Sequence, residues 1–286
     1  MDFKKILLNI SLKDLRSSEI LYYEKIYNNS LYFAQQSVEK ANKSFALFNK
    51  VIDLKELKSI GHKITTIYEK SVHSDIKITN ALIKLLNEYP ELRETDFIKE
   101  YDFENLKQYY DKKLQVFREY NEESKPFGYN SLVSFLKKIK EIRLVKIPLT
   151  NEPISLFRNK YMDFLKFAGK VEEFHGNEKL QDELNNFLND KSFVNSGDFK
   201  KVFGDVYNVM INIIKVNFIL ALYTFIFSKY GINTRYPLPD HKHDPLRVFS
   251  RKNPIIQLLP EFGYEFRLTL RRMSKLYALL EKNSKN

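Results

Sequence analysis

Arg235 and His241 are the residues whose types and spacing best suit chemistry on a phosphodiester. They lie six positions apart in NTRYPLPDHKH, residues 233–243, where the prolines exclude a helix. An imidazole can take the 2′-OH proton of RNA or protonate the leaving 5′-oxygen, and a guanidinium can stabilise the charged phosphorus transition state. The pair could therefore cleave RNA without a metal. The structural alternative is that Arg235 caps the preceding helix and the histidine is merely solvated.

Other kinds of chemistry find little support in the residue types. The chain has no Cys, which excludes thiol nucleophiles and thiolate metal sites. Its 8 Gly form neither a GxGxxG nor a GxxxxGK[ST] phosphate loop. His241, His243 and Asp244 could ligate a metal, but so few ligands on one loop do not form a cage. We therefore expect no metal site and no cofactor.

Positive charge is concentrated toward the end of the chain. Residues 201–286 carry 14 Lys and Arg against 6 Asp and Glu, and so hold +8 of the net +11. Such a local excess attracts polyanions, although a solvated Lys-rich face would have the same composition. The candidate nucleic-acid-binding residues are Arg247, Arg251, Lys252, Arg267, Arg271, Arg272 and Lys275. Helical spacing predicts that Arg267, Arg271 and Lys275 line one face.

Three aromatic residues near these cations are candidates for base stacking. They are Tyr236, Phe249 and Tyr264. The competing interpretation is that they pack inside the fold.

The elements that must position these residues are helices almost everywhere. Apolar residues recur every three or four positions, and we find no strand alternation longer than a few residues. The predicted helices are Leu12–Tyr27, one opening at Ser30, Leu54–Tyr68, Lys77–Tyr89, Phe103–Tyr120, Ser131–Val145, Asp205–Tyr230 and Leu258–Leu280. Ser11 is the expected N-cap of the first. Breakers are expected at Gly61, and within the last helix at Pro260 and Gly263.

The most apolar stretch, Val209–Phe227, is long enough to cross a bilayer. It contains Lys215, however, and an unpaired charge inside a bilayer is costly. We therefore expect a buried central helix rather than a membrane span. No targeting signal opens the chain, so we also expect a cytoplasmic protein.

The second helix has a polar face opposite its apolar stripe. Gln36, Glu39, Lys40 and Lys43 share that face, and Glu39 with Lys43 makes an i, i+4 ion pair. Taken alone, this pattern is typical of an ordinary solvated helix face.

Three short motifs, in this order, resemble the HEPN family of helical domains. The motifs are AQQSVEKANKS in the second helix, IGHKI after a short loop, and RYP before the last helix. The matching residues are Gln35, Gln36, Glu39, Lys40 and Lys43, then Gly61 and His62, then Arg235, Tyr236 and Pro237. The resemblance covers about residues 11–75 and 205–282, and it is closest to an RYP-type subgroup.

The resemblance implies an all-α, antiparallel helical bundle with a large helical insertion. The expected parts are residues 1–90 as the first part of the HEPN core, 91–200 as the insertion, and 201–286 as the last core helices with the basic region. The family also implies a homodimer, in which Arg235 and His241 of two protomers flank a shared cleft. His62 either orients a loop or lines that cleft, and the roles of the other motif residues stay open.

These observations favour two functions. The first is an RNA-binding protein acting as a metal-independent endoribonuclease, in a toxin–antitoxin or phage-defence role. The alternative is a non-catalytic module that binds nucleic acid or a nucleotide, or that docks an antitoxin or nucleotidyltransferase partner. A third interpretation is a helical protein whose basic region contacts anionic lipid.

Overall fold

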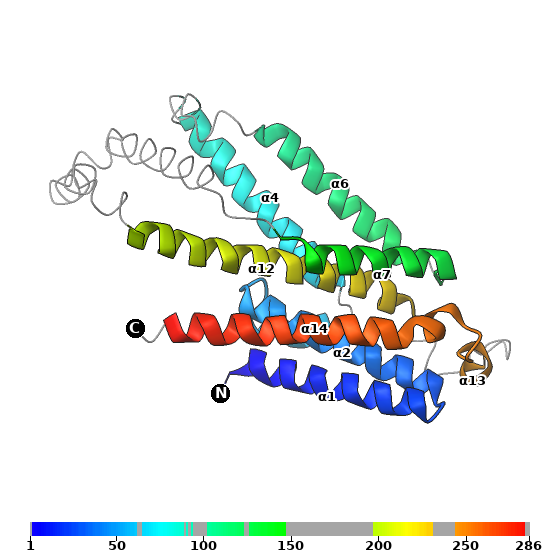
Figure 1. Ribbon diagram of the computed structural model, residues 1–286. Helices are drawn as coiled ribbons and strands as arrows, with labels where there is room; N and C mark the ends of the chain where they lie inside the picture. Colours follow the sequence, from blue (N-terminus) through cyan, green and yellow to red (C-terminus); the bar gives the residue numbers. More distant parts are fainter. Residues whose placement is uncertain are drawn as a thin grey trace. The chain divides into compact units, whose positions relative to one another are not determined.

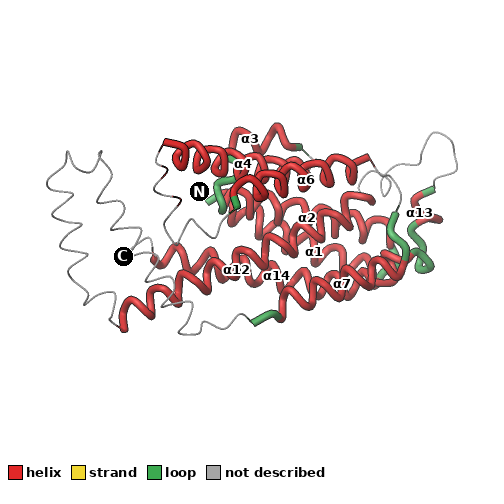
Figure 2. Tube along the Cα trace, turned by 90° about the horizontal axis from the view of Figure 1, so that it is seen from above, coloured by secondary structure: helices red, strands yellow, loops and turns green. Residues whose placement is uncertain are grey.

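The structure is a computed structural model that describes residues 2–61, 65–88, 90, 93, 102–122, 126–146, 197–230 and 244–283. Every regular element in those ranges is a helix, and none of these residues forms a strand (Figure 2). The predicted all-α fold is confirmed. The chain divides into two compact units, which are described separately. Unit 1 comprises Met1–His73, Leu114–Val145 and Asn212–Asn286, and unit 2 comprises Ser74–Lys113 and Lys146–Ile211.

Unit 1 is a bundle built around α1 and α2. These helices are α1 (Phe3–Tyr23) and α2 (Tyr27–Phe48), which a short turn folds back against each other. The last helix, α14 (Pro254–Asn283), packs against both and against α7 (Tyr129–Leu144), as Figure 1 shows. Unit 1 also contains α3 (Leu54–Ile60), the first part of α4 (Thr65–Glu88), the end of α6 (Phe103–Glu122), the second half of α12 (Gly197–Phe227), the 3-10 helix η2 (Ser228–Tyr230) and α13 (Pro245–Val248).

Buried serines at every seventh residue join α1 to α2. Ser11 and Ser37 each donate a hydroxyl hydrogen bond to the other's backbone carbonyl, at 2.8 and 2.7 Å. Seven residues before Ser37 on α2, Ser30 donates to the carbonyl of Ser18 at 2.7 Å. Seven residues after Ser37, Ser44 donates to the carbonyl of Lys4 at 2.7 Å. Small side chains let two backbones approach closely, and these bonds satisfy each buried hydroxyl. The repeat therefore fixes the antiparallel register of the pair.

An aromatic core lies where the second half of α12 meets α14. The Tyr223 hydroxyl donates to the backbone carbonyl of Phe262 at 2.7 Å, and its ring centroid lies 4.5 Å from that of Phe266. Phe227 packs edge-on against Phe262, at 6.1 Å between ring centroids. All four side chains are fully buried. The side of α12 that carries these residues is thus buried, as predicted.

The start of α12 and its opposite side depart from that prediction. The helix begins at Gly197 rather than Asp205, and Val206, Met210, Ile214 and Phe218 are exposed. Helical spacing directs these four residues to one side of α12, away from its aromatic contacts. Residues Phe203–Tyr230 are long and apolar enough to cross a membrane, with 33% of the apolar window buried. A core helix meets the same criteria, so this is weak evidence for a span.

Several predicted boundaries were wrong. The first helix begins at Phe3, so Ser11 lies inside it and binds α2 instead of acting as an N-cap. The predicted helix Leu54–Tyr68 is two helices, and the predicted breaker at Gly61 is confirmed, because this residue adopts a positive φ of 52° that ends α3. At the start of α3, Asp53 and Glu56 form a capping box.

The last helix is longer than predicted and is continuous. It runs through both Pro260 and Gly263, where the sequence suggests breaks. Pro260 itself is exposed, and packing of the flanking buried residues on either side, such as Leu259 and Phe262, keeps the helix continuous although one backbone hydrogen bond is lost. Gly263 is buried and stays helical, because helix packing outweighs its weak intrinsic propensity.

Unit 2 contains the later part of α4 and most of α6. Thr79 and Leu86 on α4 are buried. Burial raises the pKa of the Asp75 carboxyl, and the nearby charge of Lys113 opposes that shift. Most of the expected insertion, residues 91–200, lies outside the described residues.

Candidate nucleic-acid interface

The two predicted catalytic residues, Arg235 and His241, lie outside the described residues, as do Tyr236 and His62. The described chain resumes at Asp244, three positions after His241. Asp244 caps α13 by accepting a hydrogen bond from Leu246 N at 3.0 Å, and Pro245 occupies the first helical position. The segment that carries the predicted chemistry therefore ends at a well-capped short helix.

Helix α13 and the turn that follows it present three of the predicted cations. Arg247 is 90% exposed and lies 3.7 Å from the Asp244 carboxylate, a pair that contributes little in water. Arg251 and Lys252 are also exposed. Asn253 holds the turn by donating to Val248 O at 3.0 Å and accepting from Ile255 N at 3.1 Å. The backbone that carries these cations is thus fixed, while their charges stay accessible.

Phe249 anchors this turn and is not accessible to a ligand. It is buried, and its ring meets that of Tyr230 edge-on at 6.2 Å between centroids. Burial raises the pKa of the Tyr230 hydroxyl to about 12. Of the aromatic residues considered for stacking, Phe249 packs in the fold, whereas Tyr264 on α14 is 60% exposed.

The cations of α14 fall into different environments. Arg271 and Lys275 are exposed. Arg267, one helical turn before Arg271, is partly exposed and donates to the carboxylate of Glu19 on α1. The predicted basic face of α14 therefore contains two exposed cations and one that is engaged with an acid.

Arg272 lies apart from this face. Its guanidinium donates to the carbonyl of Arg143 on α7 at 3.3 Å, and its Nη1 is buried without a hydrogen-bond partner. Burial, then the charge of Arg143, lowers its pKa. Lys215 on α12 likewise donates to the carbonyl of Val145 at the end of α7. These two cations satisfy carbonyls at a helix C-terminus, where positive charge is stabilising.

The polar motif of α2 is buried, so the solvated-face interpretation was wrong. Glu39 is only 4% exposed. Its predicted ion pair with Lys43 is present, with 2.7 Å between Nζ and Oε1. Lys40 pairs with Asp14 of α1 at 2.5 Å and also donates to Gln36 at 3.3 Å. The polar side of α2 meets α1 and other parts of unit 1, which a single helix pattern does not reveal.

Lys43 connects this motif to the segment of His62. Its ammonium donates to the backbone carbonyl of Gly61 at 2.5 Å, in addition to its bond with Glu39. Gly61 is the last described residue before His62. Two of the motifs singled out in the sequence are therefore in direct contact.

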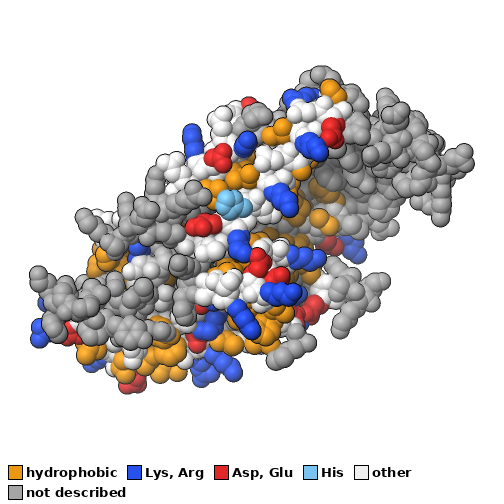
Figure 3. Space-filling model, turned by 180° about the vertical axis from the view of Figure 1, so that it is seen from behind, with side chains coloured by type: hydrophobic (Ala, Val, Ile, Leu, Met, Phe, Trp, Pro, Cys, Tyr) orange, Lys and Arg blue, Asp and Glu red, His pale blue; other side chains and the backbone are white. Residues whose placement is uncertain are grey.

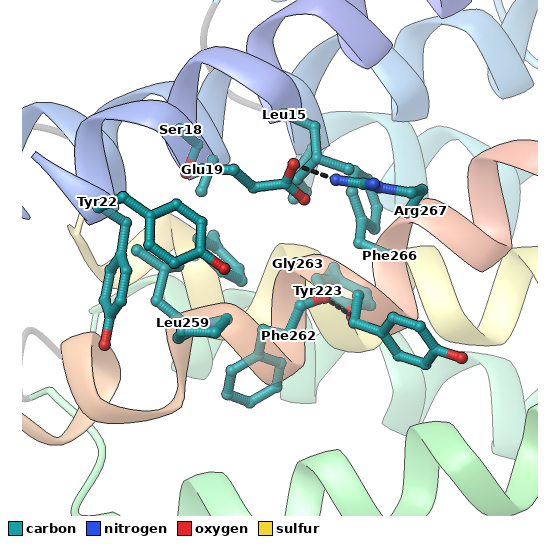
Figure 4. Close-up of a pocket in the computed structure, with 16 residues that line it drawn as sticks. Leu15, Ser18, Glu19, Tyr22, Tyr223, Leu259, Phe262, Gly263, Phe266 and Arg267 are labelled. Carbon is teal, nitrogen blue, oxygen red and sulfur yellow. Dashed lines mark hydrogen bonds and ion pairs between the residues drawn. The ribbon is translucent and has the colours of Figure 1, made fainter.

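A pocket between α1 and α14, with α2 and α12 at its base, was not predicted. It has a volume of about 390 Å³. Figure 4 shows Glu19 and Arg267 reaching toward each other across it, with Tyr22 and Leu259 toward the other end. A glycine inside a long helical pattern, Gly263, is the sequence feature that could have indicated it.

The face seen in Figure 3 has no single-sign patch. Basic and acidic side chains are intermixed there over the described residues. In the described part of the chain, no three His, Asp or Glu side chains lie close enough together to hold a metal ion.

The fold and the site define an all-α helical bundle protein with exposed cations on the turn before its last helix. Residues 5–123 match the family model of the HEPN domain, so this part of the chain is a HEPN domain, as the motifs at residues 34–44 and 60–64 predict. The match extends past residue 90, where the sequence predicts that the insertion begins. HEPN domains have nucleotide- or RNA-related functions. No curated protein and no solved structure matches the chain significantly.

Proposed function

We propose that this protein binds RNA through its C-terminal cations and cleaves it with Arg235 and His241, without a metal. The observation that carries the binding proposal is the group of exposed cations on α13, on the turn that follows it and on α14. They are Arg247, Arg251, Lys252, Arg271 and Lys275. Phosphate contacts of this kind supply most of the sequence-independent affinity for a polyanion. The HEPN match supports the same class of function.

The proposed cleavage is a transesterification. The RNA 2′-oxygen attacks the adjacent phosphorus while the imidazole of His241 takes the 2′-OH proton. The bond from phosphorus to the 5′-oxygen breaks, and an imidazolium, supplied by the second protomer of a dimer, protonates that oxygen. Arg235 stabilises the extra negative charge on the phosphoryl oxygens. The products are a 2′,3′-cyclic phosphate and a 5′-hydroxyl.

The test is incubation of the purified full chain with a mixed tRNA and mRNA pool in EDTA. We expect cleavage with 2′,3′-cyclic phosphate ends, lost in His241→Ala and in Arg235→Ala while circular dichroism shows the helices intact. His243→Ala is the matched control, because it removes another imidazole from the same segment, and we expect it to stay active. Cleavage that survives in His241→Ala contradicts the proposed mechanism.

The second candidate function is a HEPN module that binds nucleic acid or a nucleotide without cleaving it. The exposure of the cations favours it, since they are accessible whatever Arg235 and His241 do. RNA retained on a filter at low salt, with no cleavage by either the wild type or His241→Ala, would support this candidate. Binding that is unchanged between 50 and 200 mM salt would exclude a polyanion contact.

The cellular role, the partners and the domain plan belong to the same proposal. We propose a homodimer in a toxin–antitoxin or phage-defence system, with an antitoxin or nucleotidyltransferase partner. The chain would be an RYP-type HEPN core over residues 1–90 and 201–286 with an insertion at 91–200. Sedimentation equilibrium of the purified chain tests the dimer, because a monomer over the working concentration range would leave each active cleft without its second histidine.

A further inference from the structure

We propose that the pocket between α1 and α14 binds one unstacked nucleobase that carries an exocyclic amino group. This inference deepens the proposed function, on which it rests, by naming a base-binding site separate from Arg235, His241 and the exposed cations. All residues that line the pocket belong to unit 1.

The size and the walls of the pocket suit a flat ring. Its volume of about 390 Å³ lies within the range of small-molecule sites, roughly 300–1,000 Å³. Phe262 and Phe266 line its apolar base, and Tyr23 and Tyr264 line its edge with exposed fractions of 78% and 60%. Bases of every type stack favourably on exposed aromatic rings, which Tyr23 and Tyr264 provide here.

One side of the pocket is polar, which argues against a purely apolar occupant. Glu19 on α1 is paired with Arg267 on α14, and both line the pocket. A lipid tail placed there would cover this pair without offering it a hydrogen bond, at a cost in free energy. A base offers both kinds of group, because its amino group donates to a carboxylate and its ring nitrogens or carbonyl oxygens accept from a guanidinium.

Gly263 lines the pocket where α14 comes close to Glu19 and Leu15 of α1. Its backbone is helical without a positive φ, so the conformation does not require glycine. A Cβ built there would lie 3.7 Å from Glu19 Oε1 and 3.9 Å from Leu15 Cδ1, both ordinary contacts. The glycine is thus neither crowded nor strained, and a side chain larger than a methyl group at this position would press on the carboxylate oxygen of Glu19 that is not paired with Arg267 and would extend into the pocket.

A fluorescent reporter at the pocket edge can test binding directly. The chain has no Trp, so Tyr23→Trp introduces a single indole beside the pocket. The probes are AMP, CMP and GMP, with ribose 5-phosphate as the control that has the sugar and phosphate but no base. We expect the nucleotides to quench the indole and ribose 5-phosphate to leave it unchanged. A short single-stranded oligoadenylate tests whether the base comes from RNA rather than from a free nucleotide.

Filling the pocket should abolish this response. In the reporter background, Gly263→Leu should weaken binding by about tenfold or more, because its side chain would occupy the space of the base. Ser274→Leu adds the same side chain to an exposed position of α14 outside the pocket and should leave binding unchanged. If Gly263→Leu does not fold, Gly263→Ala serves, since its Cβ fits without a clash, and we expect binding weakened several-fold.

The outcomes separate this site from the proposed RNA-binding surface. Quenching by nucleotides or by the oligonucleotide that is lost in Gly263→Leu supports the pocket. Equal quenching by ribose 5-phosphate, no quenching by any base-containing probe, or full binding by a folded Gly263 variant overturns it. Filter retention of long RNA, measured in parallel, depends on the exposed cations. If only the pocket proposal is wrong, nucleotides do not quench the indole, but RNA is still retained on the filter, also by Gly263→Leu. If only the proposed function is wrong, RNA is not retained, but nucleotides still quench the indole.

Discussion

The ammonium of Lys43 is shared between the carboxylate of Glu39, at 2.7 Å, and the backbone carbonyl of Gly61, at 2.5 Å. This one side chain links the polar motif of α2 to the left-handed residue that ends α3. The same side chain holds Gly61, the residue directly before His62 in the chain. The i, i+4 pair therefore does more than stabilise its own helix.

Replacing Lys43 by Met should lower the free energy of unfolding by about 3–5 kcal/mol, because it leaves the Glu39 carboxylate buried without its cation. Urea unfolding followed by circular dichroism measures this change. The control is Lys137→Met in the exposed pair with Glu141, at 3.9 Å on α7, which should cost less than about 0.5 kcal/mol. Equal effects of the two substitutions would contradict the buried role of Lys43.

Ser37 should distinguish hydrogen bonding from close packing in the α1–α2 interface. Ser37→Ala removes its bond to the carbonyl of Ser11 and should cost about 1 kcal/mol. Ser37→Val also inserts a branched side chain where two backbones meet and should cost about 1–3 kcal/mol more. Thermal unfolding of both variants gives the comparison. A Val variant as stable as the Ala variant would show that the interface tolerates extra volume.

Alkaline titration should reveal a set of tyrosines that resist ionisation. Burial raises the pKa of Tyr68, Tyr223 and Tyr277, and raises that of Tyr230 to about 12. Since the folded values exceed the unfolded value near 10, their contribution to stability is complete below about pH 10 and is lost as the pH rises toward the folded values. Phenolate absorbance should therefore rise in two stages, the second coinciding with unfolding. A single stage without unfolding would contradict this burial.

Adjacent arginines on α14 should differ in RNA binding. Arg271→Gln removes an exposed cation and should lower the slope of log affinity against log salt by about 1. Arg272→Gln should leave that slope unchanged, because the Arg272 guanidinium contacts α7 instead of solvent. Fluorescence anisotropy with a labelled single-stranded RNA measures both slopes. An equal loss in the two variants would mean that Arg272 turns outward to reach RNA.

Helical periodicity was enough to predict the all-α fold and the Glu39–Lys43 pair, because both depend on spacing within one helix, whereas the apolar run of α12 is buried on one side only. Motif order was enough to predict the HEPN family, which the match over residues 5–123 confirms. The same local signals failed at Ser11 and at Pro260. A serine before an apolar run looks like a cap, and a proline looks like a break, unless the packing partner is known.

Only the tertiary structure decided which polar residues are buried. The serines of α1 and α2 repeat at heptad spacing, but their meaning appears only when the two helices pair and each hydroxyl finds a carbonyl on the other. Arg271 and Arg272 are neighbours of the same type, and a rotation of one residue along α14 places the first in solvent and the second against α7. The pocket depends on α1 and α14 lying side by side, with Glu19 and Arg267 separated by 248 positions in the chain. A sequence determines local periodicity and charge. The exposure of a side chain depends in addition on which helices pack against each other, and only the tertiary structure shows this.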